Sequence, residues 1–124
     1  MDAPGASFKN RPFRARLGFA AAGIRIVARR EKSFRTQLLL GAFAGVVALW
    51  LRPGWLWCAL LMLACALVLA LEMVNASLEY LMDALHPHHA VEIGHAKDAA
   101  AGAVLLASGA AAAIGAMMVT SRLL

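Results

Sequence analysis

The sequence predicts an all-α integral membrane protein, with an N-terminal amphipathic helix on the membrane surface followed by three transmembrane helices. Of its 124 residues, 62% are hydrophobic, and the mean hydropathy is +0.71. A water-soluble domain of this size could not bury so much apolar surface, whereas a bilayer accommodates it. Nine of the twelve Lys and Arg residues precede Thr36, and a basic segment ahead of apolar spans is typical of a cytoplasmic flank.

The N-terminal part divides into a polar segment and a mixed basic and apolar segment. Residues 1–12 are expected to be flexible, and residues 13–35 to form the surface helix. Its apolar side chains recur at helical spacing while its basic ones lie elsewhere, which favours binding at a membrane surface. The apolar positions that share one side are Phe13, Leu17, Ile24 and Val27. The same charges also suit a flank that only sets topology, and the two roles are compatible. Few aromatic residues accompany the charges, so nucleic acid is not an expected partner.

Three apolar runs predict the spans, which together with the surface helix form a single domain over 1–124. The first covers about 36–51, and because it is shorter than the ~20 residues of a usual span, its helix is expected to begin a little earlier. A Pro-Gly turn separates it from the second span, about 55–83, whose last turns are expected to project towards water. A loop over 84–96 precedes the third span, about 97–119.

The charge asymmetry predicts a cytoplasmic N-terminus. Three spans then bring the basic helix, the end of the second span and the 84–96 loop to the same cytoplasmic edge. The third span is rich in Ala and Gly, which allow helices to approach closely. That face can serve oligomerisation or packing within the chain.

A polar stripe marks the end of the second span. Residues 54–71 carry no charge, and Glu72, Asn75, Glu79 and Asp83 follow. At ~100° per residue the three acids fall within roughly 40° of one another, with Asn75 about 60° to one side. Acidic groups at membrane depth are costly and usually functional. The stripe therefore predicts a site at the cytoplasmic edge.

The groups that meet at this edge suit phosphate chemistry. Glu31 and Glu79 could bind Mg²⁺, which prefers one or two carboxylates together with substrate phosphates. Lys97 could contact a phosphate, and with Asp98 it opens a helix whose free N–H groups favour anions. Glu72, with apolar neighbours, could accept a proton from an alcohol. No P-loop or kinase-type glycine-rich loop is present in the sequence.

Each of these residues also has a structural interpretation. Glu31 could form a surface ion pair with its basic neighbours, and Glu79 and Asp83 could be solvated carboxylates at a helix end. Asn75 and Ser77 could form hydrogen bonds between helices. The histidines of the loop favour a solvated segment or a weak nucleotide contact over a metal cluster; they are His86, His88, His89 and His95.

Three segments together resemble the bacterial membrane diacylglycerol kinase family, which includes undecaprenol kinases. The segments are E-x-x-N-A-S-L-E-x-x-x-D from Glu72, A-K-D-A-A-A-G-A-V-L-L from Ala96, and G-I-R…E-K-S-F-R from Gly23. The resemblance covers about residues 13–119 and implies a homotrimer with sites shared between subunits, in the bacterial inner membrane. It further implies transfer of the γ-phosphoryl group of ATP to a lipid hydroxyl without a phosphoenzyme.

The resemblance also assigns expected roles to individual residues. It implies that Glu72 is the general base and Asn75 its polar support beside the reacting hydroxyl. It implies that Glu31 and Glu79 bind Mg²⁺. The residues expected to bind the metal-nucleotide complex as a whole are Glu31, Glu79, His89, Lys97 and Asp98.

The predicted activity is an ATP-dependent diacylglycerol kinase, with an undecaprenol kinase as the alternative. A membrane adaptor that binds anionic lipid, or a proton-coupled transporter that uses Glu72, would also explain the stripe. The set of Glu31, Lys97 and Asp98 favours the kinase, because an adaptor needs no such set. A transporter would more often place its acid near the midplane of the bilayer.

Overall fold

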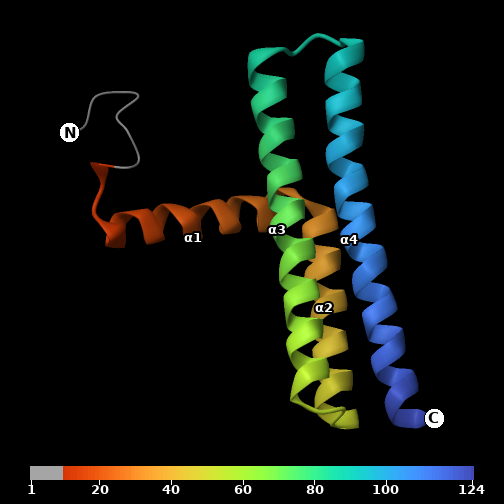
Figure 1. The fold of residues 1–124 in the computed structure, drawn as a ribbon. Coiled ribbons are helices and arrows are strands. Elements are labelled where there is room, and N and C mark those ends of the chain that lie inside the picture. Colours follow the sequence, from red (N-terminus) through yellow and green to blue (C-terminus); the bar gives the residue numbers. More distant parts are fainter. Residues whose placement is uncertain (1–9) are drawn as a thin grey trace.

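The computed structural model describes residues 10–124, and the regular structure in this range is helical (Figure 1). Its helices are α1 (Phe13–Arg30), α2 (Lys32–Leu51), α3 (Trp55–Leu85) and α4 (Val91–Leu123). The last three are long and apolar enough to cross a membrane. The prediction of an all-α membrane protein with three candidate spans is therefore confirmed. Most of the segment expected to be flexible, residues 1–9, lies outside the described residues.

The helix expected over 13–35 is in fact divided at Glu31. That residue is extended, with φ −106° and ψ 109°, and α2 begins directly after it. The break is stabilised from both sides: the Glu31 N–H donates to the Val27 carbonyl at 2.8 Å. The Arg35 guanidinium donates to the Ala28 and Arg29 carbonyls at 2.9 Å each. These bonds satisfy carbonyls that a helix end leaves without partners. Residues 32–35 thus lengthen the first span, which begins before Thr36 as its short apolar run predicts.

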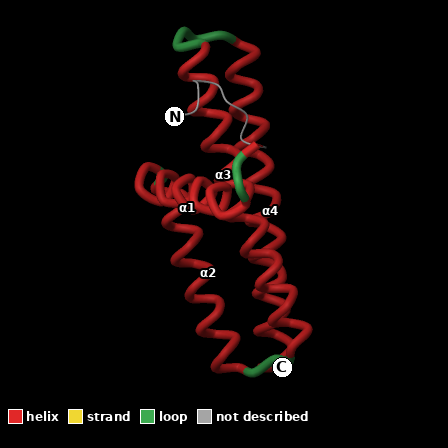
Figure 2. The backbone as a smooth tube through the Cα atoms, turned by 90° about the vertical axis from the view of Figure 1, so that its left-hand side faces the viewer, coloured by secondary structure: helices red, strands yellow, loops and turns green. Residues whose placement is uncertain are grey.

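Because of this corner, α1 projects sideways from the three long helices (Figures 1 and 2). Near the corner, Val27 is buried against Phe34 and Ala76. Further out, apolar side chains such as Phe13 and Leu17 are exposed, at 71% and 55%. The described part of the chain leaves this apolar surface of α1 uncovered.

Helix α3 packs against both α2 and α4, whereas α2 and α4 contact each other at few points. Ala48, Leu61 and Met118 form a small core shared by the three helices. Two polar contacts join α2 to α4. The amide of Gln37 donates to the Ser108 hydroxyl at 2.9 Å, and the Arg122 guanidinium donates to the Leu51 carbonyl at 2.8 Å. The polar contacts therefore hold the two outer helices near both ends of α2.

The second and third spans are longer than expected, and the loop between them is shorter. Helix α3 ends at Leu85 rather than 83, and α4 covers Val91–Leu123 rather than 97–119. Residues 91–96 continue the helix because the Gly94 N–H already bonds the Ala90 carbonyl at 3.0 Å and Glu92 suits the N-terminal dipole. With 31 residues against 20, α3 extends roughly 16 Å beyond the start of α2. The α3–α4 hairpin therefore rises past α1 (Figure 1).

We expect the Gln37–Ser108 hydrogen bond to stabilise the bundle measurably. In a double-mutant cycle of Gln37→Ala and Ser108→Ala, the coupling should be about 0.6 kcal/mol and at most ~1.7 kcal/mol, the range for hydrogen bonds between membrane helices. Reversible unfolding with SDS in detergent micelles measures it. Ser121→Ala is the control, because this hydroxyl bonds only the Met118 carbonyl of its own helix. The control cycle combines Gln37→Ala with Ser121→Ala and should show no coupling. Equal coupling energies in the two cycles would contradict a stabilising Gln37–Ser108 hydrogen bond.

Candidate functional site

Glu72 is the one buried charged residue among those described, with 5% of its surface exposed. It lies on α3 at the level where α2 begins. The Ser33 hydroxyl, from the first turn of α2, donates to Glu72 Oε2 at 2.9 Å. A buried carboxylate needs such a donor because it has lost its water. One oxygen of Glu72 is thus held by a neighbouring helix, while Oε1 accepts no hydrogen bond from residues 10–124.

Asn75 lies one turn further along α3 and has a buried oxygen without a hydrogen-bond partner in the described chain. Its amide nitrogen donates to Glu79 Oε1 at 3.5 Å, and the Ser77 hydroxyl donates to the Val74 carbonyl. Both bonds stay within α3, so within residues 10–124 Asn75 and Ser77 do not form the hydrogen bonds between helices that their structural interpretation predicted. A buried polar atom without a partner calls for a water, an ion or a ligand.

Glu31 occupies the corner between α1 and α2. Its Oε1 accepts a hydrogen bond from the Tyr80 hydroxyl of α3 at 2.7 Å. The Arg30 guanidinium lies over the Tyr80 ring, 5.3 Å from its centroid. The expected surface ion pair between Glu31 and its basic neighbours is therefore replaced by a contact across to α3.

A second polar group lies higher on the α3–α4 hairpin. The Lys97 ammonium pairs with Asp83 at 2.7 Å. Asp83 is therefore part of an ion pair, and not only a solvated carboxylate at a helix end. Glu79 lies between the two groups along α3, directly before Tyr80 and one helical turn before Asp83. Asp98 is exposed and makes no hydrogen bond or ion pair within residues 10–124.

His89 lies apart from these residues. It is exposed in the loop that follows α3, which begins roughly 20 Å beyond Glu72 along the helix axis. In the same loop, Nδ1 of His86 lies 2.8 Å from the His88 carbonyl. The structure therefore places Glu31 beside the stretch of α3 that carries Glu72, Asn75 and Glu79, a level about 10 Å deep along the helix axis. Lys97 and Asp98 lie above it, and His89 lies at the tip of the hairpin.

The oxygen atoms at this level suit a hard cation. Among the described residues, no group of three or more His, Cys, Asp or Glu side chains gathers at a metal-binding distance. Mg²⁺ usually takes only one or two carboxylates and completes its shell with substrate phosphates and water. Glu31 and Glu79, with the unpartnered Asn75 oxygen nearby, fit that pattern of incomplete protein coordination.

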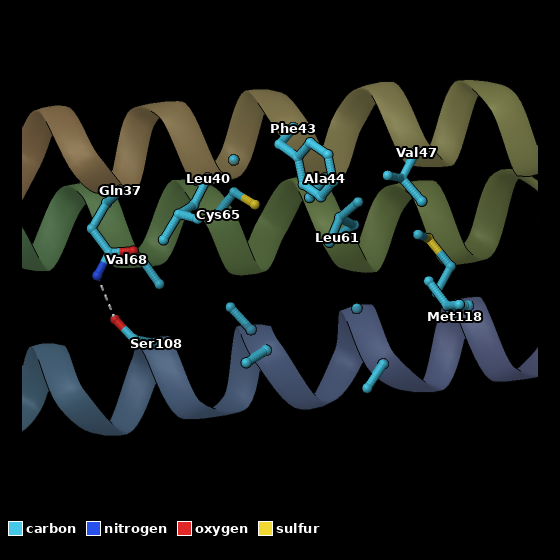
Figure 3. Close-up of a pocket in the computed structure, with 16 residues that line it drawn as sticks. Gln37, Leu40, Phe43, Ala44, Val47, Leu61, Cys65, Val68, Ser108 and Met118 are labelled. Carbon is cyan, nitrogen blue, oxygen red and sulfur yellow. Dashed lines mark hydrogen bonds between the residues drawn. The ribbon is translucent and has the colours of Figure 1, made fainter.

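An apolar cavity of ≈ 370 Å³ opens between α2, α3 and α4 on the other side of this level. Figure 3 shows the Gln37–Ser108 pair at one end of the cavity and Val47 and Met118 towards the other. Val68, one of its lining residues, precedes Glu72 by one helical turn. The cavity therefore runs within the apolar part of the bundle and ends about one helical turn before the buried carboxylate, which does not line it.

Sequence reasoning missed the partners that hold the acids, namely Ser33 and Tyr80. Ser33 falls within the E-K-S-F-R segment and Tyr80 directly follows Glu79. The only available signal was therefore proximity in sequence to predicted site residues. Both bonds join residues about forty to fifty positions apart, across helices. Such pairings depend on how the helices pack, which helical periodicity does not report.

Three helices long and apolar enough to cross a membrane, with a polar cluster at one end of the apolar bundle, define the class of the protein as an integral membrane protein. The family model described as prokaryotic diacylglycerol kinase matches residues 18–119, and the chain belongs to this family. The resemblance predicted from the three sequence segments is confirmed. The family implies a bacterial membrane lipid kinase, a phosphotransferase with an alcohol acceptor. A comparison with curated proteins gives no significant match.

Removing the donor of Glu72 is expected to destabilise the protein. Ser33→Ala leaves a buried carboxylate without its hydrogen bond, which should cost roughly 1–3 kcal/mol. Unfolding with SDS in micelles measures the loss. Ser77→Ala is the matched control, because that exposed hydroxyl bonds only the Val74 carbonyl of its own helix. If both variants unfold at the same SDS fraction, Ser33 does not support Glu72.

Proposed function

We propose that this protein is an ATP-dependent diacylglycerol kinase, which transfers the γ-phosphoryl group of MgATP to the lipid hydroxyl and forms phosphatidic acid and ADP. The observation that carries the proposal is the position of Glu72. This buried carboxylate lies between an apolar cavity on one side and the carboxylates and ammonium group of the α3–α4 hairpin on the other. A lipid acceptor and a charged donor would meet there.

The acceptor side is argued from the cavity. Its lining is apolar apart from the Gln37–Ser108 pair, so it suits the hydrocarbon chain of a lipid. A chain lying there would bring the lipid headgroup up to Glu72. Because Ser33 already holds Oε2, Oε1 is the oxygen that would take the proton of the hydroxyl. The hydroxyl oxygen then bonds to the γ-phosphorus as the bond to the bridging oxygen of ADP breaks. Asn75 would support the reacting hydroxyl.

The donor side is argued from the charges above Glu72. Glu31 and Glu79 would hold Mg²⁺, which when bound neutralises the charge of the phosphates. Lys97 would leave Asp83 to contact a phosphate, with Asp98 beside it. His89, at the tip of the hairpin, would contact the outer part of an extended nucleotide. Phosphoryl transfer leaves the protein mainly positioning and charge stabilisation to perform.

The proposed setting is the inner membrane of a bacterium, with the N-terminus in the cytoplasm. Nine of the twelve Lys and Arg residues precede Thr36, which supports this orientation. The exposed apolar side chains of α1 and its sideways course support a position on the membrane surface. We further propose a homotrimer, on the family resemblance. Neighbouring subunits would then complete a site in which each chain supplies few metal ligands.

The decisive experiment supplies radiolabelled ATP and Mg²⁺ to the purified protein in mixed micelles containing either diacylglycerol or undecaprenol. Labelled phosphatidic acid is the expected product. Label in undecaprenyl phosphate alone would make the protein an undecaprenol kinase. Absence of label in both lipids, from a folded protein, would favour the adaptor or transporter alternatives.

Glu72→Gln is expected to abolish transfer, because the amide cannot accept the proton while it still fills the same space beside Ser33. General-base catalysis typically contributes 10²–10⁴-fold, so the turnover number should fall by about that factor. Oligomer assembly should be unchanged. Glu92→Gln, the same substitution at an exposed position of α4, should retain activity. Full turnover by the Glu72 variant would remove this residue as the base.

A further inference from the structure

Glu31 is held differently from the other acids of the site. Its backbone lies between two helices, and the N–H and carbonyl are both engaged, with Val27 and Arg35. Its side chain is bonded from α3, where the Tyr80 hydroxyl donates to Oε1 at 2.7 Å. The main chain and one carboxylate oxygen are thus both held, and Oε2 has no hydrogen-bond partner in the described part of the chain.

The donor itself is anchored independently of Glu31. The half-buried Tyr80 ring packs against the cluster of Val27, Phe34 and Ala76. Its face carries the Arg30 guanidinium at 5.3 Å, a cation–π contact. Because packing and charge hold the ring, the phenol hydrogen is presented at a defined position. Glu31 is therefore the partner that is oriented, and Tyr80 is the group that orients it.

We propose that Tyr80 is a positioning residue for the divalent cation that accompanies the nucleotide. The phenol occupies Glu31 Oε1, so Oε2 is the oxygen that would bind the cation. This inference rests on the proposed function, in which Glu31 is a metal ligand. A carboxylate that binds a metal is commonly held by a hydrogen bond from a second residue, and losing that residue costs 10–100-fold in metal affinity.

The geometry also allows a simpler role, in which Tyr80 only ties the α1–α2 corner to α3. The two roles differ in what Tyr80→Phe changes. This substitution keeps the ring against the Val27 cluster and beneath Arg30 and removes only the hydroxyl. A structural tie would alter the stability of the corner, whereas a positioning residue alters metal affinity.

The test is a direct measurement of metal binding. Mn²⁺ replaces Mg²⁺, and its electron paramagnetic resonance signal reports free ion during titration of the full-length protein in micelles with a non-hydrolysable ATP analogue. We expect Tyr80→Phe to bind Mn²⁺ at least about tenfold more weakly than the wild type. Glu31→Gln should also bind more weakly. Adding Tyr80→Phe to Glu31→Gln should cause no further loss, because the phenol acts through that carboxylate.

Ser77→Ala is the control, because it removes another hydroxyl of α3 that is exposed and bonds only the Val74 carbonyl of its own helix. Its Mn²⁺ affinity should equal that of the wild type. Unchanged affinity in Tyr80→Phe, with a loss in Glu31→Gln, would overturn the inference and leave the proposed function standing. Unchanged affinity in Glu31→Gln would instead remove the metal role of Glu31, and the inference with it. If Tyr80→Phe lowers the Mn²⁺ affinity by the same factor in the wild type and in the Glu31→Gln variant, the inference is also overturned, because the phenol would then not act through Glu31.

Discussion

A carboxylate buried within a membrane-length helix is the constraint on which the rest of this structure depends. Glu72 follows a run without charge over residues 54–71, and 5% of its surface is exposed. Such a group needs a donor from another helix. Ser33 supplies it because the chain breaks at Glu31, which starts α2 beside the middle of α3. The break at Glu31 therefore has two consequences: it turns α1 sideways, and it brings Ser33 to the depth of Glu72.

The unequal lengths of the helices divide the bundle into an apolar and a polar part. Below the corner, α2, α3 and α4 run together and leave a cavity suited to hydrocarbon. Above it, α3 and α4 are the described helices that continue, and the Asp83–Lys97 pair joins them. A reaction between a lipid and a charged phosphate donor needs such a boundary, because each substrate is stable on only one side of it. Glu72 and Asn75 lie at that boundary.

Much of the architecture was predictable because hydrophobicity and helical periodicity are local properties. The apolar runs predicted three spans, and the short first run predicted a helix that begins before Thr36, as α2 does. The break at Glu31 was not predictable, since EKSFR continues the preceding helical pattern and the Arg35 bonds that stabilise the corner form only after the chain has turned. The extent of α4 was underestimated because residues 91–96 are too polar to be counted within a span.

The sequence by itself determined the membrane class, the face of α3 that carries Glu72, Glu79 and Asp83, and the kinase family, because these depend on composition, spacing and motif. Only the tertiary structure decided which acid is paired with which donor: Ser33 with Glu72, Tyr80 with Glu31, and Lys97 with Asp83. It also separated His89 from Glu72 by the length of the hairpin. Hydrogen bonds between helices depend on the depth and rotation at which the helices pack, and residues far apart in sequence set both.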